Sequence, residues 1–269
     1  IDHICETKSG DILTAGTCQE DDGEHYRRGE SNYSYTDLVF AKYDPDGTCI
    51  STKKYGGSDF DSFRSAFYSP DIGYVITGNT QSGDGDITKR KEQGDRLYPR
   101  EFLTVLDDDL NEKWQYVFED ENQIYLSYIV VAGKRIYVTG PLSEDTGKHN
   151  QTAVFTFGPD GADMKSAIIN ASLVTGMAVS DNGLLISVNP FDPDTNDHSG
   201  APQIYKLNTD LTVEAVIDDV SAKGFGYQVI PTADDGFFTI QCQIVKYLPQ
   251  PLTMGRGIED TATILSRFD

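Results

Sequence analysis

The sequence predicts an all-β chain built from repeated four-stranded antiparallel sheets. Three observations support this: apolar residues alternate over strand length without a helical period, turn residues separate these runs, and one strand–turn–strand pattern recurs. The recurring turn contains a glycine in every copy. These glycines are roughly 50 to 60 residues apart, and they are Gly10, Gly73, Gly133, Gly183 and Gly236.

Each repeat is expected to contain four strands, A to D. The A–B hairpin surrounds the glycine turn, and strand B is expected at residues 12–17, 74–80, 135–140, 184–188 and 237–241. Strand C is expected at residues 38–43, 102–106, 153–157, 203–207 and 263–268. C–D turns are expected at residues 44–47, 107–111, 158–161 and 208–210, where Asp, Asn and Gly tolerate positive φ. Strand D follows, for example at residues 113–118.

The fifth repeat ends at Asp269, directly after strand C, so either its sheet has three strands or a further strand lies outside these residues. Five sheets in radial array would protect their edges against one another. We therefore expect a single domain over residues 1–269, a five-bladed β-propeller of four-stranded antiparallel blades with a last blade of three or four strands. The expected blades are approximately 1–58, 59–119, 120–170, 171–220 and 221–269. Ring closure predicts contacts between residues 4–12 and 229–240.

The composition restricts the partners. Among 269 residues, 43 are acidic and 22 basic, which gives a net charge of −21. This charge repels phosphate backbones and anionic surfaces, so we expect no nucleic-acid partner and a monomeric chain. No run of about 18 apolar residues occurs, so we expect no membrane insertion.

Four cysteines are present without a C-x-x-C pair, which excludes a zinc ribbon. We expect each to be a free, buried thiol that folding does not require. Cys5, Cys18 and Cys49 fall on different strands of the first repeat, where direct bridging would strain the geometry. Cys18 and Cys242 are the best remaining pair, because both lie at the end of a strand B in repeats that ring closure would make adjacent.

Parts of the first two repeats resemble a known family. The segments are D-L-V-F-A-K-Y-D-P-D-G at 37–47, Y-G-G-S at 55–58 with Asp61, G-Y-V-I-T-G at 73–78 and S-G-D-G-D at 82–86. They are similar to the SBBP-like "D-G-G-Y-I-x-x-G" repeats of bacterial secreted and cell-surface β-propeller proteins. The resemblance implies a propeller fold and a secreted or cell-surface location. It assigns no catalytic residue, because none belongs to the repeat itself.

Long B–C loops are expected on one face of the propeller, at residues 18–36, 81–100, 143–151, 190–201 and 245–260. Long loops on a rigid scaffold are where binding residues concentrate, so this face is expected to bind carbohydrate or protein. Strand A also begins on this face. The ligand-binding candidates are Asp61, Arg64, Tyr125, Tyr227, Tyr33 and Tyr98. Further residues expected near the channel mouth are His3, Tyr128 and Gln228.

Other interpretations of these residues remain open. The loop tyrosines could pack within their own loops, and Asp61 could make a structural hydrogen bond, since the resembling repeats have aspartate there. A glycoside hydrolase is the enzymatic alternative, because two carboxylates suffice for that chemistry. Its candidate carboxylates are Asp59, Glu119, Asp120, Glu121, Asp218 and Asp219. No pair among them is distinguished, so no catalytic residue is assigned. A structural spacer without a ligand is the third possibility.

No cofactor or metal is expected, with calcium as the alternative. The acidic segments 84–86 and 192–197 have the alternating oxygen ligands that calcium prefers, but neither completes a calcium-binding loop, so they are interpreted as acidic turns. The four histidines are dispersed, without zinc-site spacing. Trp114 alternates with Tyr116 and Phe118 and is expected in the core.

Overall fold

The structure of the chain is a computed structural model. It describes residues 1–19, 36–88, 99–118, 123–143, 151–171, 173–180, 183–190, 202–218, 224–232, 237–248 and 257–268. Throughout these residues the regular structure is strand, so the predicted all-β class is confirmed. Within the same residues, no helix is long and apolar enough to cross a membrane.

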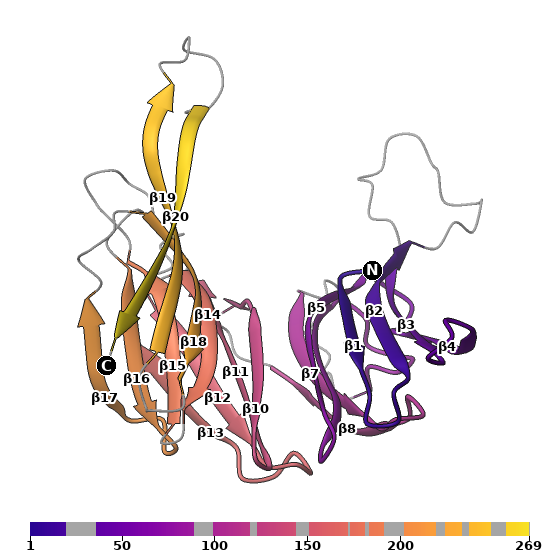
Figure 1. Cartoon of the computed structure of the whole chain (residues 1–269). Helices are drawn as coiled ribbons and strands as arrows, with labels where there is room; N and C mark the ends of the chain where they lie inside the picture. Colours follow the sequence, from indigo (N-terminus) through magenta and orange to yellow (C-terminus); the bar gives the residue numbers. More distant parts are fainter. Residues whose placement is uncertain are drawn as a thin grey trace, which may run out of the picture. The chain divides into compact units, whose positions relative to one another are not determined.

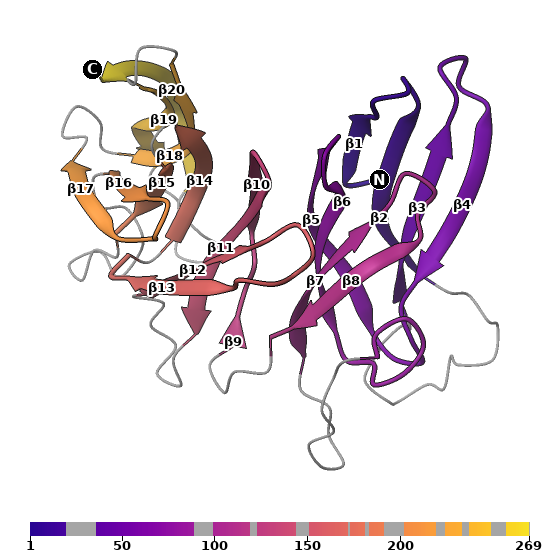
Figure 2. The same ribbon diagram turned by 90° about the horizontal axis from the view of Figure 1, so that it is seen from below.

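The first two sheets are four-stranded antiparallel meanders, each in sequence order (Figure 1). The strands of the first are β1 (His3–Glu6), β2 (Ile12–Gln19), β3 (Thr36–Tyr43) and β4 (Cys49–Tyr55). The strands of the second are β5 (Asp61–Ser69), β6 (Gly73–Thr80), β7 (Arg100–Leu106) and β8 (Glu112–Val117). Figure 2 shows the same sheets from below. The predicted A-to-D order is confirmed in both.

Three more sheets follow along the chain, all antiparallel where their pairing is given. The third contains β9 (Gln123–Ile124), β10 (Tyr128–Ala132), β11 (Arg135–Ser143), β12 (Gln151–Phe157) and β13 (Lys165–Ile169). The fourth contains β14 (Leu173–Ser180), β15 (Gly183–Asn189), β16 (Gln203–Asn208) and β17 (Val213–Asp218). The last is three-stranded, with β18 (Gly224–Pro231), β19 (Phe237–Leu248) and β20 (Gly257–Phe268).

Two strand predictions need correction. β9 was not predicted, and it pairs with β11 beside the four-stranded path of the third sheet. The predicted loop 245–260 is too long, because β19 runs to Leu248 and β20 begins at Gly257, with Leu248 opposite Gly257. The alternating Val-Lys-Tyr-Leu sequence at residues 245–248 suits a strand, so the hairpin extends into the region assigned to the loop. Closure of the sheets into a ring stays a prediction.

The predicted C–D turns share one backbone conformation. In each of the four turns, the backbone amide of the fourth residue donates a hydrogen bond to the carbonyl of the first residue. The donor residues are Gly47, Leu110, Gly161 and Leu211. Each of these donor residues has a positive φ, which only glycine adopts without strain. Leu110 and Leu211 accept that strain and are 1% and 3% exposed, so burial of their side chains offsets it.

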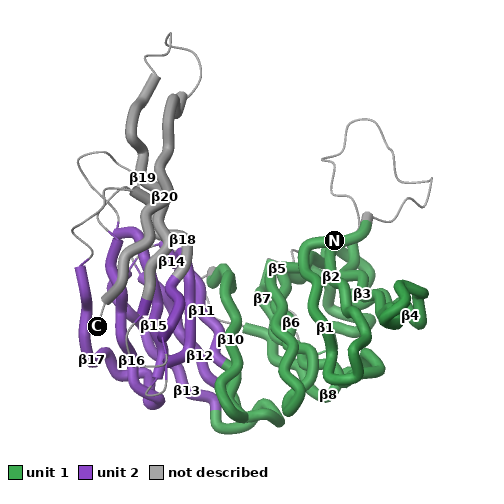
Figure 3. Tube along the Cα trace, in the orientation of Figure 1, with its two compact units in different colours: residues 1–136, 157–163 green, residues 137–156, 164–269 purple. Residues whose placement is uncertain are grey.

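The chain divides into two compact units, coloured separately in Figure 3. The first comprises Ile1–Ile136 and Phe157–Asp163, and its core lies between the first two sheets. The centre of that core is aromatic: Phe40 meets Tyr55 and Tyr74 at ring-centroid distances of 6.3 and 6.1 Å, and Phe102 meets Tyr55 at 6.1 Å. These four side chains are fully buried, and burial of each stabilises the fold by about 1.5–3 kcal/mol.

Trp114 is buried as expected. Its indole Nε1 donates to the Pro159 carbonyl at 2.8 Å, and its ring packs on Phe157 at 5.9 Å. The second unit comprises Tyr137–Thr156 and Met164–Asp269 and has its own apolar cluster. That cluster contains Leu185, Ile204, Val229 and Phe237.

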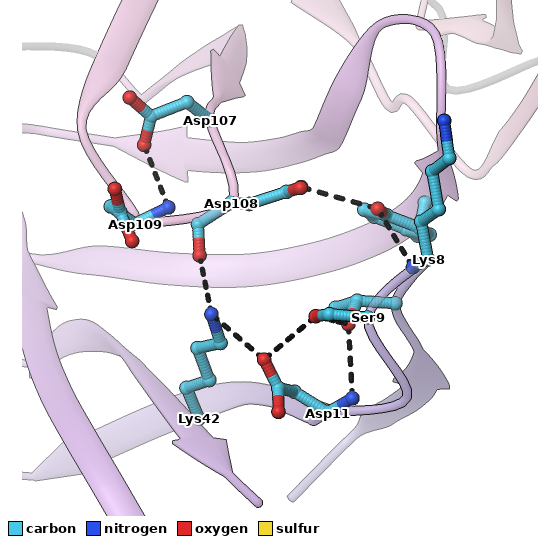
Figure 4. Close-up of polar contacts among 9 residues, drawn as sticks. Lys8, Ser9, Asp11, Lys42, Asp107, Asp108 and Asp109 are labelled. Atoms are coloured by element: carbon cyan, nitrogen blue, oxygen red, sulfur yellow. Dashed lines mark hydrogen bonds and ion pairs between the residues drawn. The ribbon is translucent and has the colours of Figure 1, made fainter.

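A polar network joins the first two sheets at their short turns (Figure 4). Lys42 Nζ pairs with Asp11 Oδ2 at 3.0 Å and donates to the Asp108 carbonyl at 3.2 Å. Tyr68 donates to Asp108 Oδ1 and accepts from the Lys8 amide. The network therefore connects the two sheets at this end.

Three cysteines, Cys5, Cys18 and Cys49, are free thiols, while the side chain of Cys242 lies outside the described residues. The expectation that each is buried is wrong for these three, because Cys49 is exposed and the other two are half-buried. Burial among core residues nevertheless raises the pKa of Cys5 to about 11, so this thiol stays protonated and unreactive at neutral pH.

Candidate functional site

The segment that follows the last strand of the first sheet is hydrogen-bonded to the second sheet near the predicted channel mouth. We call residues 55–61 together with 80–86 the Gly-Asp junction. Within it, Asp61 Oδ2 accepts from the Gly57 amide at 2.7 Å and from Ser82 Oγ at 2.8 Å. Asp61 is fully buried, and burial raises its pKa against the opposing effect of these donors. Asp61 is therefore held by the fold, which supports the structural interpretation of this residue.

The glycines of the junction are needed because the two segments approach closely. A Cβ on Gly57 would lie 2.6 Å from the Asp84 carbonyl oxygen, and one on Gly85 would lie 2.3 Å from that of Gly56. Gly85 also has a φ of +67°, which disfavours any other residue. The Y-G-G-S and S-G-D-G-D segments of the resembling repeats thus form one tight contact between successive sheets.

The acidic turn 84–86 has structural hydrogen-bond partners. Asp84 Oδ1 accepts from the Ser58 amide at 2.8 Å, and Asp86 Oδ2 accepts from the Gly56 amide at 3.2 Å. Across the described part of the chain, no cluster of three or more His, Cys, Asp or Glu side chains is arranged to hold a metal ion. The other acidic segment, 192–197, lies outside the described residues.

A pocket opens beside the junction, at the end of the second sheet where β6 ends and β7 begins. Its volume is about 230 Å³, and it is lined by Phe60, Arg64, Asn79, Gln81, Pro99, Ile124 and Tyr125. The structure thus brings together two predicted site residues, Arg64 from β5 and Tyr125 from the segment between β9 and β10. The pocket lies on the side of the long B–C connection, since Gln81 and Pro99 at the two ends of that connection line it.

Arg64, which lines the pocket, lies at a β-bulge in β5. Phe63 pairs with Gly78 and Ser65 with Thr77, so Arg64 is an extra residue in β5 without a partner opposite. A bulge of this kind redirects a side chain and is common beside functional sites. The same register shift occurs in strand A of two other sheets, at Thr175 in β14 and at Tyr227 in β18. The predicted candidates Arg64 and Tyr227 therefore occupy equivalent backbone positions.

Glu101 on β7 is a buried carboxyl behind the pocket. Its Oε1 lies 3.5 Å from Arg64 Nε and accepts from Asn79 Nδ2 at 3.3 Å. Its Oε2 receives no hydrogen bond from any residue that the structure describes. Glu101 is 3% exposed, and burial raises its pKa to about 7 despite the opposing effects of Arg64, Asn79 and the Leu126 amide. A carboxyl with this pKa changes its charge near neutral pH.

The remaining candidates are less clearly placed. Tyr33 and Tyr98 lie outside the described residues, as do Glu119, Asp120, Glu121 and Asp219. For Tyr227 and Gln228 only the backbone is described. Asp218 accepts from Gln203 Nε2 at 2.7 Å on the neighbouring strand, and Asp59 Oδ1 accepts from the Phe60 amide. No pair among the described members of this carboxylate set is distinguished.

His3 and Tyr128 are partly enclosed side chains. The His3 ring shares a 2.9 Å hydrogen bond with the Tyr74 hydroxyl and packs beside Phe63. In the first sheet His3 pairs with Ala15, so it lies four residues from the loop end of β2 at Gln19, and its place at a channel mouth stays a prediction. Tyr128 begins β10, and burial raises its pKa.

Sequence reasoning missed Glu101 and Asn79 as parts of the site. A signal was available for Glu101, since it is a charged residue directly before the mainly apolar segment F-L-T-V-L at 102–106. A carboxylate within a buried strand implies a partner or a perturbed pKa. Asn79 had no such signal, because polar residues are ordinary at the end of a strand.

No protein-family model matches the chain, and no curated protein sequence matches it. Among solved structures, the chain is similar to the polysaccharide lyase Uly1, with a TM-score of 0.53, 11% identity, and coverage of 99% of this chain and 57% of that one. At this identity the likeness shows the fold alone, and that fold is propeller-like and all-β.

Two further similar structures are a variant and a cobalt-substituted form of Synechocystis apocarotenoid oxygenase. Both have a TM-score of 0.49, with 11% and 12% identity. The matched regions cover 86% and 88% of this chain, and 52% and 54% of the two oxygenase chains. The chain therefore spans about half the length of the solved structures that it matches.

Proposed function

We propose that the chain is a ligand-binding β-propeller module that holds a saccharide in the pocket beside the Gly-Asp junction. One observation supports this most directly: the pocket combines the aromatic side chains Phe60 and Tyr125 with the polar groups of Arg64, Asn79 and Gln81. A sugar ring has an apolar face that packs on aromatic rings and a rim of hydroxyls that needs hydrogen-bond donors and acceptors. Both are present within one pocket.

The size of the pocket restricts the ligand. Pockets for drug-sized molecules measure roughly 300–1,000 Å³. A volume of about 230 Å³ suits one sugar ring or one amino-acid side chain and is too small for an extended chain. We favour the sugar, because Asn79, Gln81 and Arg64 together offer more hydrogen-bonding groups than a single amino-acid side chain would use. A protein ligand that inserts one polar side chain is the competing partner.

The setting of this module is also a proposal. The resemblance of the first two repeats supports a secreted or cell-surface location in a bacterium and a monomeric ring of five blades forming a single domain. The Gly-Asp junction agrees with that resemblance, because its segments make the contact between successive sheets.

A glycoside hydrolase is the second candidate, and Glu101 is the observation that favours it. A general acid needs a raised pKa, and burial gives Glu101 a pKa of about 7. We place it second because Glu101 lies behind the lining of the pocket. Release of reducing ends from a glycan by the purified chain, abolished in Glu101→Gln, would favour hydrolysis over binding alone.

Replacing Tyr125 by alanine is expected to weaken saccharide binding by about tenfold, because an aromatic wall of the pocket is lost. The measurement is a glycan array followed by calorimetric titration of the best ligand. Ile168→Ala is the matched control, since Ile168 is another exposed apolar residue, on β13 and outside the pocket lining. Unchanged affinity in Tyr125→Ala, or an equal loss in the control, would contradict binding in this pocket.

A further inference from the structure

We propose that the pocket recognises a carboxylate on its saccharide, with Arg64 as the anion-binding residue, so that the ligand is a uronic acid. This inference rests on the proposed function and names the class of sugar bound at that site. It follows from the position of Arg64, from the neutral lining around it, and from the carboxyl group behind it.

The guanidinium of Arg64 has unused donor capacity. A guanidinium carries five N–H donors, and a carboxylate accepts two of them in parallel. Among the described residues, Glu101 is the partner that the structure gives to Arg64, through Nε at 3.5 Å. The Arg64 side chain is 41% exposed and lines the pocket, whereas the side chain of Glu101 is 2% exposed. A ligand can therefore reach the guanidinium, while Glu101 contacts it from the protein side.

The rest of the lining carries no charge at neutral pH. Asn79 and Gln81 are amides, and the other lining residues are apolar or aromatic. A neutral sugar would satisfy the amides and the aromatic faces, but it would leave the partly desolvated guanidinium with Glu101 as its one anionic partner among the described residues. A uronic acid has the same ring and hydroxyls, and it adds the one group that Arg64 pairs with best.

Glu101 competes with the ligand for Arg64. When Glu101 is ionised it neutralises the guanidinium, and when it is protonated the full positive charge is available to the ligand. Its other contacts are uncharged: Asn79 from β6 and the Leu126 amide from the segment after β9. Because burial raises the pKa of Glu101 to about 7, the competition weakens as the pH falls through neutrality. A uronide is therefore expected to bind more tightly at pH 6 than at pH 8.

Calorimetric titration of a matched pair of sugars tests this inference. Methyl β-D-glucuronide and methyl β-D-glucoside differ only in the carboxylate, and they are small enough that the net charge of −21 does not repel them as it would an anionic polymer. At about pH 6 the glucuronide is expected to bind about tenfold more tightly. Arg64→Gln should remove this preference and change glucoside affinity less than about threefold, and Arg64→Lys should keep part of it.

Two further variants test whether net charge or the titration of Glu101 causes the changes in affinity. Lys165→Gln removes a cation on β13 that pairs with Asp210, so it is the control for net charge and should leave both affinities unchanged. Glu101→Gln should keep the preference for glucuronide but make it independent of pH. Circular dichroism verifies that each variant is folded. A variant that fails to fold is set aside, and the sugar pair with the unchanged chain still decides the question.

The outcomes separate the two proposals. Equal affinity of the unchanged chain for both sugars, or tighter glucoside binding, would overturn the carboxylate inference and leave the pocket as a site for neutral saccharides. If neither sugar binds and no glycan on an array is retained, the proposed function fails, and this inference fails with it. A glucuronide preference that persists in Arg64→Gln would place the anion-binding residue elsewhere.

Discussion

Replacing Asp61 by alanine is expected to lower the free energy of unfolding by about 2–4 kcal/mol. The substitution leaves the Gly57 amide and the Ser82 hydroxyl without their acceptor, and each unsatisfied buried donor costs about 1–3 kcal/mol. Part of this cost is offset, because the raised pKa of Asp61 indicates that burial of its charge is itself unfavourable. Urea unfolding followed by circular dichroism measures the change.

Asp61→Asn is the matched variant for this experiment. Its amide oxygen can take the place of Oδ2 and accept from both the Gly57 amide and the Ser82 hydroxyl, so a smaller loss than in Asp61→Ala is expected. Saccharide affinity provides the second readout. If Asp61→Ala is as stable as the unchanged chain but no longer binds sugar, then Asp61 is a ligand-binding residue, and the structural interpretation of the Gly-Asp junction is wrong.

Features of the fold that depend on neighbouring residues could be predicted from the sequence. The turn at 44–47 is an example, because Asp44 Oδ1 accepts from the Asp46 and Thr48 amides within the same short segment. The A–B hairpins follow the same rule, since a glycine with positive φ begins β6 at Gly73 and β15 at Gly183. Such local chemistry determines strand order and turn positions without knowledge of tertiary packing.

The candidate site could be predicted only in part, because its properties depend on residues far apart in the sequence. Arg64 and Tyr125 were identified from the start of strand A, but the bulge that redirects Arg64 depends on how β5 aligns with β6. The pKa of Glu101 depends on burial by β6, by β5 and by the segment around Leu126, none of which is its sequence neighbour. Sequence patterns indicated the face of the site but not its electrostatics.

Replacing Glu101 by glutamine is expected to stabilise the chain at alkaline pH. Burial raises the pKa of Glu101 from an ordinary value of 4.5 to about 7 in the folded state. Below pH 4.5 the group is protonated in both the folded and the unfolded state, so it costs no stability. As the pH rises from 4.5 to 7, the unfolded chain releases this proton and the folded chain keeps it, so stability is lost. Above 7 the loss levels off at about 3 kcal/mol.

The measurement compares urea unfolding of the two proteins at about pH 5.5 and about pH 8.5, which avoids the low solubility expected near the isoelectric point of about 4.4. Between these two values, the stability of Glu101→Gln relative to the unchanged chain should rise by about 2 kcal/mol, since part of the cost is already present at pH 5.5. All other titrating groups cancel in this difference. Glu214→Gln, which changes an exposed carboxylate on β17, should show no such rise. A difference that stays constant across this range would mean that Glu101 titrates in its ordinary range, and the competition with a ligand for Arg64 near neutral pH would then not occur.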